Sequence, residues 1–231
     1  MLSVNKLNQY YGESHTLWDV DFEISKGGCV CLMGRNGVGK TTLLKSIMGL
    51  IPVESGNIVY SGQTLTTKPA EARARLGIGY VPQGRDVFPL LTVEENLKTG
   101  LGSRRDNKRF IPEKIYELFP VLKEMKNRRG GDLSGGQQQQ LAIGRVLALD
   151  PDLLILDEPT EGIQPNIVQQ IGDVITMLNQ EEGLTVLLVE QKLPFARRIG
   201  NEFIIMDRGK NVAAGPMTEL NDQVVKQFLT V

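Results

Sequence analysis

The chain has 231 residues, of which 26 are Lys or Arg and 27 are Asp or Glu, so its formal net charge is −1. This length predicts one domain, or one domain with a small subdomain, and the balanced charge argues against a general attraction to nucleic acid or anionic lipid. No apolar run approaches the roughly 18 residues of a membrane-spanning helix. Two cysteines and no signal peptide favour a reducing cytoplasm.

The N-terminal segments predict antiparallel strands. Residues 20–24 alternate between apolar and acidic side chains, and the segment around residues 2–7 is similar; this is the period of a strand with one solvated face. Residues 29–33 are apolar throughout and predict a strand buried on both faces. Cys29 and Cys31 would point to one face of it. Because the only histidine, His15, is distant, we expect buried, unreactive thiols and no metal site.

A glycine-rich segment follows this strand and fits the pattern G-x-x-x-x-G-K-[ST] of a phosphate-binding loop. Its residues are Gly34, Arg35, Asn36, Gly37, Val38, Gly39, Lys40 and Thr41. The glycines let successive backbone N–H groups converge on phosphates, helped by the dipole of the helix predicted over residues 43–48. We expect Lys40 to contact the β- and γ-phosphates, Thr41 to hold Mg²⁺ and Thr42 to bond an α-phosphate. The alternative is a plain glycine-rich turn.

The middle of the chain differs from its two ends. Residues 69–76, 93–101 and 112–122 predict helices, and no strong strand is predicted between residues 84 and 131. Residues 102–109 are polar and predict a solvated loop. These features indicate a helical subdomain inserted into an α/β core.

A serine–glycine segment then opens a long helix. Its residues are Ser134, Gly135, Gly136 and Gln137. Such a helix start binds anions, and because the chain already has one phosphate loop, we expect the second site to serve the nucleotide of a second subunit. The alternative is an ordinary serine–glycine helix cap.

Strands and helices alternate in the C-terminal part, which predicts a largely parallel sheet surrounded by helices. The predicted elements are a strand at Leu153, a helix from Asn166, a strand at Leu184, a helix near Phe195 and a strand at Phe203. Asp157 and Glu158 end the first of these strands, at the edge where open α/β sheets bind ligands. We expect Asp157 to hold Mg²⁺ through water and Glu158 to act as general base. The alternative is an exposed acidic turn. Residues 221–231 fit either a terminal helix or a regulatory tail.

In this order, the phosphate loop, the serine–glycine segment and the apolar strand ending in Asp-Glu resemble the ATP-binding subunit of ATP-binding cassette (ABC) transporters, over essentially the whole chain. The resemblance implies an α/β P-loop NTPase cassette with a mostly parallel sheet, an N-terminal antiparallel β subdomain and an inserted helical subdomain. Residues 1–83 and 150–231 would form the core, and residues 84–149 the helical subdomain.

The resemblance also implies cofactors and partners. ATP and Mg²⁺ would bind between two cassettes paired head to tail, with each ATP between one subunit's phosphate loop and the other's serine–glycine segment. The partners would be a second ATPase subunit, identical or different, two transmembrane permease subunits and, indirectly, a periplasmic solute-binding protein, with no nucleic acid. The chain would lie peripherally on the cytoplasmic face of the inner membrane.

Individual residues acquire roles from the same resemblance. Tyr11 stands where the family places an aromatic ring that stacks on adenine, with Tyr10 as the alternative. Gln83 matches the glutamine that reaches the metal and the attacking water. Residues 87, 88 and 90 would lie near the groove that receives the membrane subunit, or else in the core of the subdomain.

Two departures from the family pattern narrow the prediction. Gln191 replaces the switch histidine, so it can bond a γ-phosphate but cannot become cationic, and residues 161–165 lack the usual aspartate, which leaves dimer contacts at Gln164 open. Such a glutamine is typical of one of the paired ATPases of branched-chain amino acid importers. Segments 34–45, 130–147 and 158–165 resemble the urea importer within that class.

The resemblance therefore implies an ATPase that drives uptake of urea, with branched-chain or other amino acids as the alternative solute. Hydrolysis at the site with Gln191 is expected to differ from that in a partner that carries histidine. A soluble ATP-driven switch and a nucleotide-binding partner with little catalysis of its own are the remaining alternatives.

Overall fold

The central sheet has six strands in the computed structural model, which describes residues 1–229, in the order β10-β9-β3-β8-β7-β6. All neighbouring strands are parallel except β9 and β10, which are antiparallel. The predicted, mostly parallel sheet is confirmed. The strands are β3 (Cys29–Met33), β6 (Ile78–Val81), β7 (Leu153–Asp157), β8 (Thr185–Val189), β9 (Glu202–Asp207) and β10 (Lys210–Pro216).

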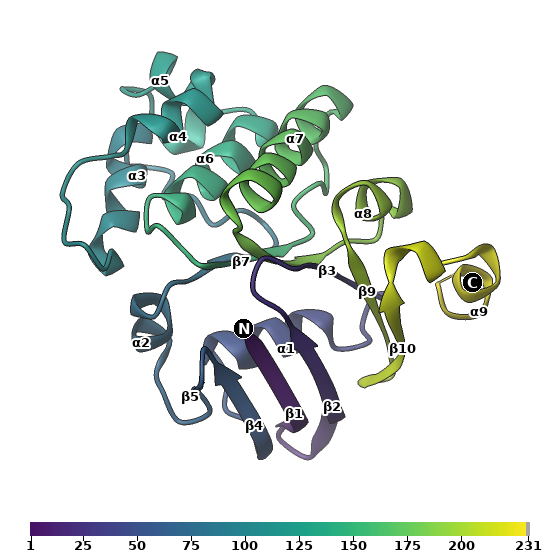
Figure 1. The fold of residues 1–231 in the computed structure, drawn as a ribbon. Helices are drawn as coiled ribbons and strands as arrows, with labels where there is room; N and C mark the ends of the chain where they lie inside the picture. The colour runs from purple at the N-terminus through teal and green to yellow at the C-terminus, as the bar shows by residue number, and fades with distance from the viewer. Residues whose placement is uncertain (230–231) are drawn as a thin grey trace.

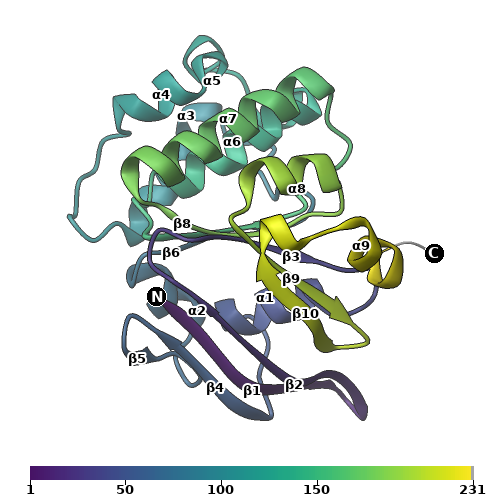
Figure 2. The same cartoon turned by 45° about the vertical axis from the view of Figure 1, so that its right-hand side comes forward.

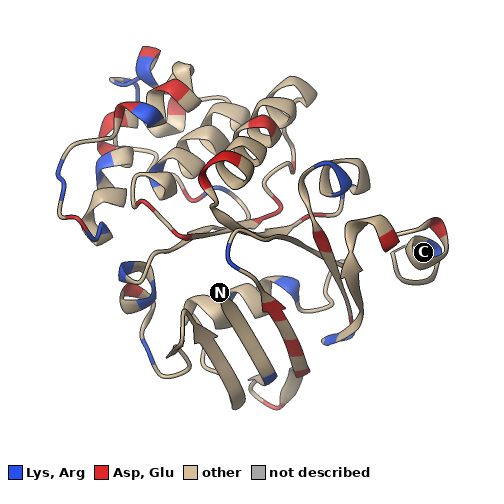
Figure 3. Cartoon of the chain, viewed as in Figure 1, with Lys and Arg blue, Asp and Glu red and all other residues tan. Residues whose placement is uncertain are grey.

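A second, antiparallel sheet lies below the first in Figure 1, with the order β2-β1-β4-β5. The predicted N-terminal strands are confirmed, and the acidic residues of β2 lie on its exposed face (Figure 3). The sequence did not predict β4 or β5, nor β6 and β10 of the central sheet. The strands are β1 (Leu2–Tyr11), β2 (Ser14–Ile24), β4 (Ser55–Tyr60) and β5 (Gln63–Thr64).

Most helices cover one side of the central sheet, whereas α1 lies between the two sheets (Figures 1 and 2). Short 3₁₀ turns occur at Leu101–Ser103, Gly130–Asp132 and Met217–Glu219. Among the described residues, no helix is both long and apolar enough to cross a bilayer. The helices are α1 (Lys40–Met48), α2 (Ala70–Arg75), α3 (Val93–Gly100), α4 (Glu113–Leu118), α5 (Pro120–Glu124), α6 (Gly135–Leu147), α7 (Pro165–Glu182), α8 (Leu193–Ile199) and α9 (Asp222–Phe228). Of the segment 221–231, residues 230–231 lie outside the described residues.

Two predictions for the helical region need correction. The single helix predicted over residues 112–122 is wrong, because the chain breaks at Phe119 between α4 and α5. Pro120 has no N–H to donate and disfavours a helical conformation at the residue before it. The loop at residues 102–109 is solvated only in part. The Arg104 side chain is 8 % exposed and donates to the Ala148 carbonyl at 3.1 Å.

Strand β3 separates two apolar clusters, which explains why it is apolar throughout. Cys29, Cys31 and Met33 pack with the helices above the sheet, whereas Val30 and Leu32 pack with α1 and the antiparallel sheet below it. Both cysteines are buried and free, as predicted. Burial raises the pKa of the Cys29 thiol to about 12, so it stays protonated and unreactive at neutral pH.

Candidate nucleotide site

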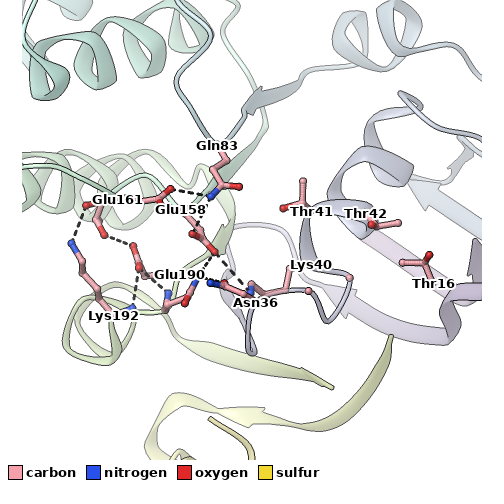
Figure 4. Close-up of a pocket in the computed structure, with 14 residues that line it drawn as sticks. Thr16, Asn36, Lys40, Thr41, Thr42, Gln83, Glu158, Glu161, Glu190 and Lys192 are labelled. Atoms are coloured by element: carbon pink, nitrogen blue, oxygen red, sulfur yellow. Dashed lines mark hydrogen bonds and ion pairs between the residues drawn. The ribbon is translucent and has the colours of Figure 1, made fainter. Parts of the chain in front are cut away.

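A cavity of about 610 Å³ lies where the carboxyl ends of β3, β7 and β8 meet (Figure 4). It brings together residues from the phosphate loop, from the loop after β6 and from the loops after β7 and β8. The lining residues are Thr16, Asn36, Gly37, Gly39, Lys40, Thr41, Thr42, Gln83, Glu158, Thr160, Glu161, Glu190, Gln191 and Lys192. Most of the residues predicted from the loop, together with Gln83, Glu158 and Gln191, therefore face one cavity.

The phosphate loop has the backbone that its glycines predict. Gly34 has a positive φ of 146°, and a side-chain Cβ there would lie 2.4 Å from the Met206 carbonyl oxygen, so no larger residue fits. Val38 packs in the apolar cluster around α1, and Arg35 contributes its carbonyl oxygen to the interior of the loop. These residues shape the loop and do not line the cavity.

Lys40 holds its ammonium group inside the loop. Its Nζ donates to the carbonyls of Gly34, at 2.8 Å, and Arg35, at 2.9 Å, and lies 3.9 Å from Glu158 Oε1. Burial lowers the pKa of Lys40, and the negative charges of Glu158 and Asp157 oppose that shift. The result is a compact cation at the floor of the cavity, where an anionic phosphate would lie.

Asp157 is almost fully enclosed at the end of β7, only 1 % exposed, and neither of its carboxylate oxygens has a hydrogen-bond partner among the described residues. Burial raises the pKa of the Asp157 carboxyl, and the negative charge of Glu158 raises it further. The nearby Thr41 hydroxyl lowers this pKa, although it makes no hydrogen bond of ordinary geometry to the carboxylate. An unpartnered buried carboxylate close to the Thr41 hydroxyl offers oxygen donors of the kind that suits Mg²⁺. The residues present therefore fit that ion.

Glu158 lies at the centre of the polar network. Its φ is +49°, an uncommon conformation for a residue other than glycine. Its Oε1 accepts a hydrogen bond from Gln191 Nε2 at 2.5 Å, and its Oε2 lies 3.5 Å from Gln83 Nε2. Gln83 bonds Glu161 more closely, at 2.9 Å (Figure 4). Gln83, Gln191 and Lys40, all predicted site residues, therefore approach the Glu158 carboxylate.

Gln191 bridges two sides of the cavity. Its Nε2 donates both to Glu158 Oε1 and to Asn36 Oδ1 of the phosphate loop, the latter at 2.7 Å. The neutral amide therefore connects the loop after β8, the phosphate loop and the end of β7. A nucleotide phosphate entering here would compete for these N–H groups.

Tyr11 is not brought to the cavity. It is 49 % exposed at the end of β1, and it is absent from the cavity lining. Tyr10, the alternative, stacks on His15 with 4.0 Å between ring centroids, and His15 stacks on Trp18 at 3.5 Å. One face of the Tyr10 ring is therefore occupied, and adenine stacking on Tyr11 stays a prediction.

The serine–glycine segment also lies away from the cavity of its own chain. Ser134 caps α6: its hydroxyl accepts from the Gln137 N–H at 3.4 Å, and its own N–H donates to Gln137 Oε1 at 2.9 Å. The helix cap considered as the alternative is thus present. Gly135 and Gly136 leave room for the neighbouring side chains of Arg85 and Ile167.

Five cavity-lining residues were missed by sequence reasoning, namely Thr16, Thr160, Glu161, Glu190 and Lys192. Only Glu190 carried a recognisable signal, because it is an acid directly after a buried apolar strand, as Asp157 and Glu158 are. The remaining residues lie in segments whose patterns gave no indication of the site.

A hairpin turn supports the phosphate loop from outside the cavity. Between β9 and β10, the N–H of Gly209 donates to the Val38 carbonyl at 2.9 Å, and its carbonyl accepts from the Trp18 N–H at 2.9 Å. Gly209 has a φ of +77°, and a Cβ there would lie 2.1 Å from the Thr16 carbonyl oxygen. Only glycine fits this junction.

Comparison with known proteins places this geometry in context. A family model described as ABC transporter matches residues 17–161. The chain is 45 % identical to the high-affinity branched-chain amino acid transport ATP-binding protein BraG of Pseudomonas aeruginosa, covering 92 % of this chain and 91 % of that protein. It is 40 % identical to the probable branched-chain amino acid transport ATP-binding protein LivF of Archaeoglobus fulgidus, covering 95 % and 94 %. Its fold matches a dimeric, post-hydrolysis structure of the ATP-binding cassette MJ0796 bound to ADP and Pi, with a TM-score of 0.83 and 26 % identity over 94 % of this chain and 99 % of that one.

Proposed function

The chain belongs to the ABC transporter family and is an ATPase of that family, and from this premise we propose that it drives the import of branched-chain or related amino acids. The relatives BraG and LivF, which are named for branched-chain amino acid transport, support this solute better than urea. Urea stays the second candidate, on the resemblance of segments 34–45, 130–147 and 158–165.

One observation carries the catalytic part of the proposal: Gln83, Lys40 and Gln191 all approach the Glu158 carboxylate at the rim of one cavity. Glu158 acts as the general base that takes a proton from the attacking water. Gln191 donates its amide N–H groups to the γ-phosphate in place of a cationic histidine. Catalysis then depends on position and charge stabilisation around that phosphate.

The phosphate loop binds the triphosphate in this proposal. Backbone N–H groups of residues 34–39 and the Lys40 ammonium surround the β- and γ-phosphates. Thr41, Gln83 and Asp157 would hold Mg²⁺, and Thr42 would bond an α-phosphate. Bound there, the ion would supply positive charge that stabilises the charge developing on the phosphate oxygens. The role of Tyr11 in stacking on adenine is proposed from the family resemblance alone.

A second cassette completes the site. Ser134, Gly135, Gly136 and Gln137 lie outside the cavity of their own chain and offer a helix start that can bind an anion. We place them on the γ-phosphate bound to the partner's loop. Whether the partner is identical or carries a histidine at the position of Gln191 sets the balance of hydrolysis between the two sites.

We propose that the membrane subunit docks into a groove of about 590 Å³ beside β6, the edge strand of the central sheet. It is lined mostly by apolar groups, among them Leu50, Tyr80 and Phe88, and the Arg145 guanidinium lies 5.2 Å from the Phe88 ring centroid. Leu90 is exposed outside the groove, and Val87 packs on the helical core instead. Docking there would hold the chain on the cytoplasmic face of the inner membrane and let residues 84–149 move with the membrane subunit.

The experiment that tests the proposal purifies a tagged copy from detergent-solubilised membranes and reconstitutes the complex in liposomes with its solute-binding protein. We expect ATP hydrolysis to accompany uptake of radiolabelled leucine, isoleucine or valine, and both to be lost in a complex that carries Glu158→Gln. Uptake of urea but not of these amino acids would overturn the solute. Recovery of the chain without membrane subunits would overturn the import role.

A further inference from the structure

We propose that Glu190 is the residue that positions both candidate catalytic side chains, Glu158 and Gln191. It directly follows β8 and lines the cavity, yet it is only 2 % exposed. A buried carboxylate is costly unless hydrogen bonds satisfy it, so its contacts should explain why it is there. This inference rests on the proposed roles of Glu158 and Gln191.

The Glu190 carboxylate is held by three donors from two loops. Its Oε1 accepts from the backbone N–H groups of Gln191, at 2.8 Å, and Lys192, at 2.9 Å. Its Oε2 accepts from the Thr160 hydroxyl at 2.7 Å. Hydrogen bonds to an ionised acceptor are shorter and stronger than neutral ones. One side chain therefore joins the loop after β8 to the loop after β7.

Residues of the loop after β8 form hydrogen bonds with both the side-chain hydroxyl and the backbone carbonyl of Thr160. Besides the bond to Glu190, its carbonyl accepts from Lys192 Nζ at 2.9 Å, and the residue is fully buried. Thr160 lies two residues beyond Glu158, whose left-handed backbone is strained and persists only where its surroundings fix it. The bonds at Thr160 supply such a constraint and keep the Glu158 carboxylate facing the cavity.

The same carboxylate also sets the direction of Gln191. Binding of the Gln191 N–H by Glu190 fixes the backbone from which the amide side chain extends to Glu158 and Asn36. Glu190 thus controls both partners of the contact between Gln191 and Glu158 without itself touching either side chain in the described hydrogen-bond network. That is the behaviour of a positioning residue and not of a catalytic one.

The chemistry of the three donors predicts which substitutions are tolerated. Glutamine can keep its oxygen on the two backbone N–H groups and offer its NH₂ to Thr160, whose hydroxyl can accept instead of donate. Alanine makes none of these bonds. Thr160→Val keeps the shape of threonine and removes only the hydroxyl.

The test measures steady-state ATP hydrolysis by the full chain with its partner cassette. In Glu190→Ala we expect kcat to fall about 10- to 100-fold, the range expected when reacting groups shift by about 1 Å, while KM for ATP changes by less than about threefold. Glu190→Gln should stay within about threefold of wild type, and Thr160→Val should lose about three- to tenfold in kcat at unchanged KM.

A matched control separates positioning from stability. Asn221 accepts the N–H groups of two successive residues at the start of α9, as Glu190 does before α8, but it lies outside the cavity. Asn221→Ala should lower the melting temperature without lowering kcat. A Glu190→Ala enzyme with unchanged kcat, or one whose KM rises in proportion to its loss of kcat, would overturn the proposal. If Glu190→Ala does not fold, Thr160→Val becomes the test, and unchanged turnover of Thr160→Val would overturn the proposal.

A cycle with Glu158→Gln distinguishes this inference from the proposed function beneath it. If Glu190 acts through Glu158 and Gln191, adding Glu190→Ala to an enzyme that already carries Glu158→Gln and Gln191→Ala should slow single-turnover hydrolysis no further. Additive losses would overturn the inference alone. A Glu158→Gln enzyme with normal turnover would instead refute the proposed role of Glu158.

Discussion

Two helices of this chain begin with glycine-rich segments suited to anions, but their first turns are satisfied in different ways. The start of α1 follows Gly39, which offers no side-chain cap, so its N–H groups point to the cavity with Lys40 beside them. The start of α6 is closed by a reciprocal capping box between Ser134 and Gln137. The first end is prepared for a ligand within its own chain. The second is satisfied by its own side chains, and its proposed ligand is the nucleotide of a partner subunit.

The largest expected effect tests whether hydrolysis depends on the cavity next to the start of α1, where Glu158 lies. Replacing Glu158 by glutamine removes the candidate base and should lower kcat about 10²- to 10⁴-fold, while ATP binding is retained. Steady-state hydrolysis and calorimetric titration measure the two quantities. Glu161→Gln is the matched control, because Glu161 also lines the cavity and bonds Gln83. Equal losses in both variants would show that the base is misassigned.

Nucleotide affinity should depend on the α1 end in the isolated chain. Lys40→Ala removes a charge-assisted contact to phosphate and should weaken ATP binding about 10- to 100-fold. Lys45→Ala, one turn further along α1, serves as the control and should bind normally. Titration with a fluorescent ATP analogue measures both. An affinity unaffected by Lys40→Ala would mean that the loop binds nucleotide through its backbone only.

The α6 end should matter only when two cassettes meet. Ser134→Ala should leave ATP binding to the monomer unchanged and lower dimer turnover about tenfold, the equivalent of one hydrogen bond to a charged group. It also removes a helix cap, at about 1 kcal/mol. Thr92→Ala removes an equivalent capping box, that of α3 with Glu95, outside the cavity. If both variants lose turnover equally, the loss reflects helix stability and the two ends do not differ as described.

The smallest effect concerns Asp157, the unpaired carboxylate at the end of β7 near the start of α1. Because burial raises the pKa of Asp157 in the folded chain above its unfolded value, its contribution to stability is lost as pH rises from the unfolded pKa through the folded one. Asp157→Asn removes that dependence. Without nucleotide at neutral pH, it should raise the melting temperature by about 2–4 °C, or about 1 kcal/mol. Thermal melts of both proteins at pH 4 and pH 7 measure this difference in stability. An Asp157→Asn variant that is less stable than the unaltered chain at neutral pH would contradict the prediction that the buried, ionised carboxylate destabilises the fold.

Local patterns allowed much of the α1 end to be predicted from the sequence. The apolar strand over residues 29–33, the glycine loop and the acids after residues 153–156 are each contiguous, so composition and spacing indicate both structure and chemistry. Tertiary bonds are different. Thr160 and Glu190 meet across 30 residues of chain, and the sequence offers no means of pairing them.

The missed strands and the broken helix have physical causes. β5 has two residues, β6 has four and includes Gly79, and β10 is half-exposed along its length, so none shows a strong apolar period. The helix predicted over residues 112–122 followed apolar spacing through Pro120, which should have indicated a boundary. For the second helix start, the sequence left two readings open, because a serine followed three residues later by glutamine fits both a helix cap and an anion-binding start; the structure shows the cap.

The turn at Gly209 has a practical consequence for work with this protein. A hairpin that is distant in sequence from every nucleotide-binding motif is an attractive place to attach an epitope or a fluorophore, yet this one is hydrogen-bonded to the phosphate loop at Val38. The exposed turn at Ser61 and Gly62, where an added Cβ meets nothing within 4 Å, is the better choice. A probe inserted there would report on the molecule without altering what it is meant to observe.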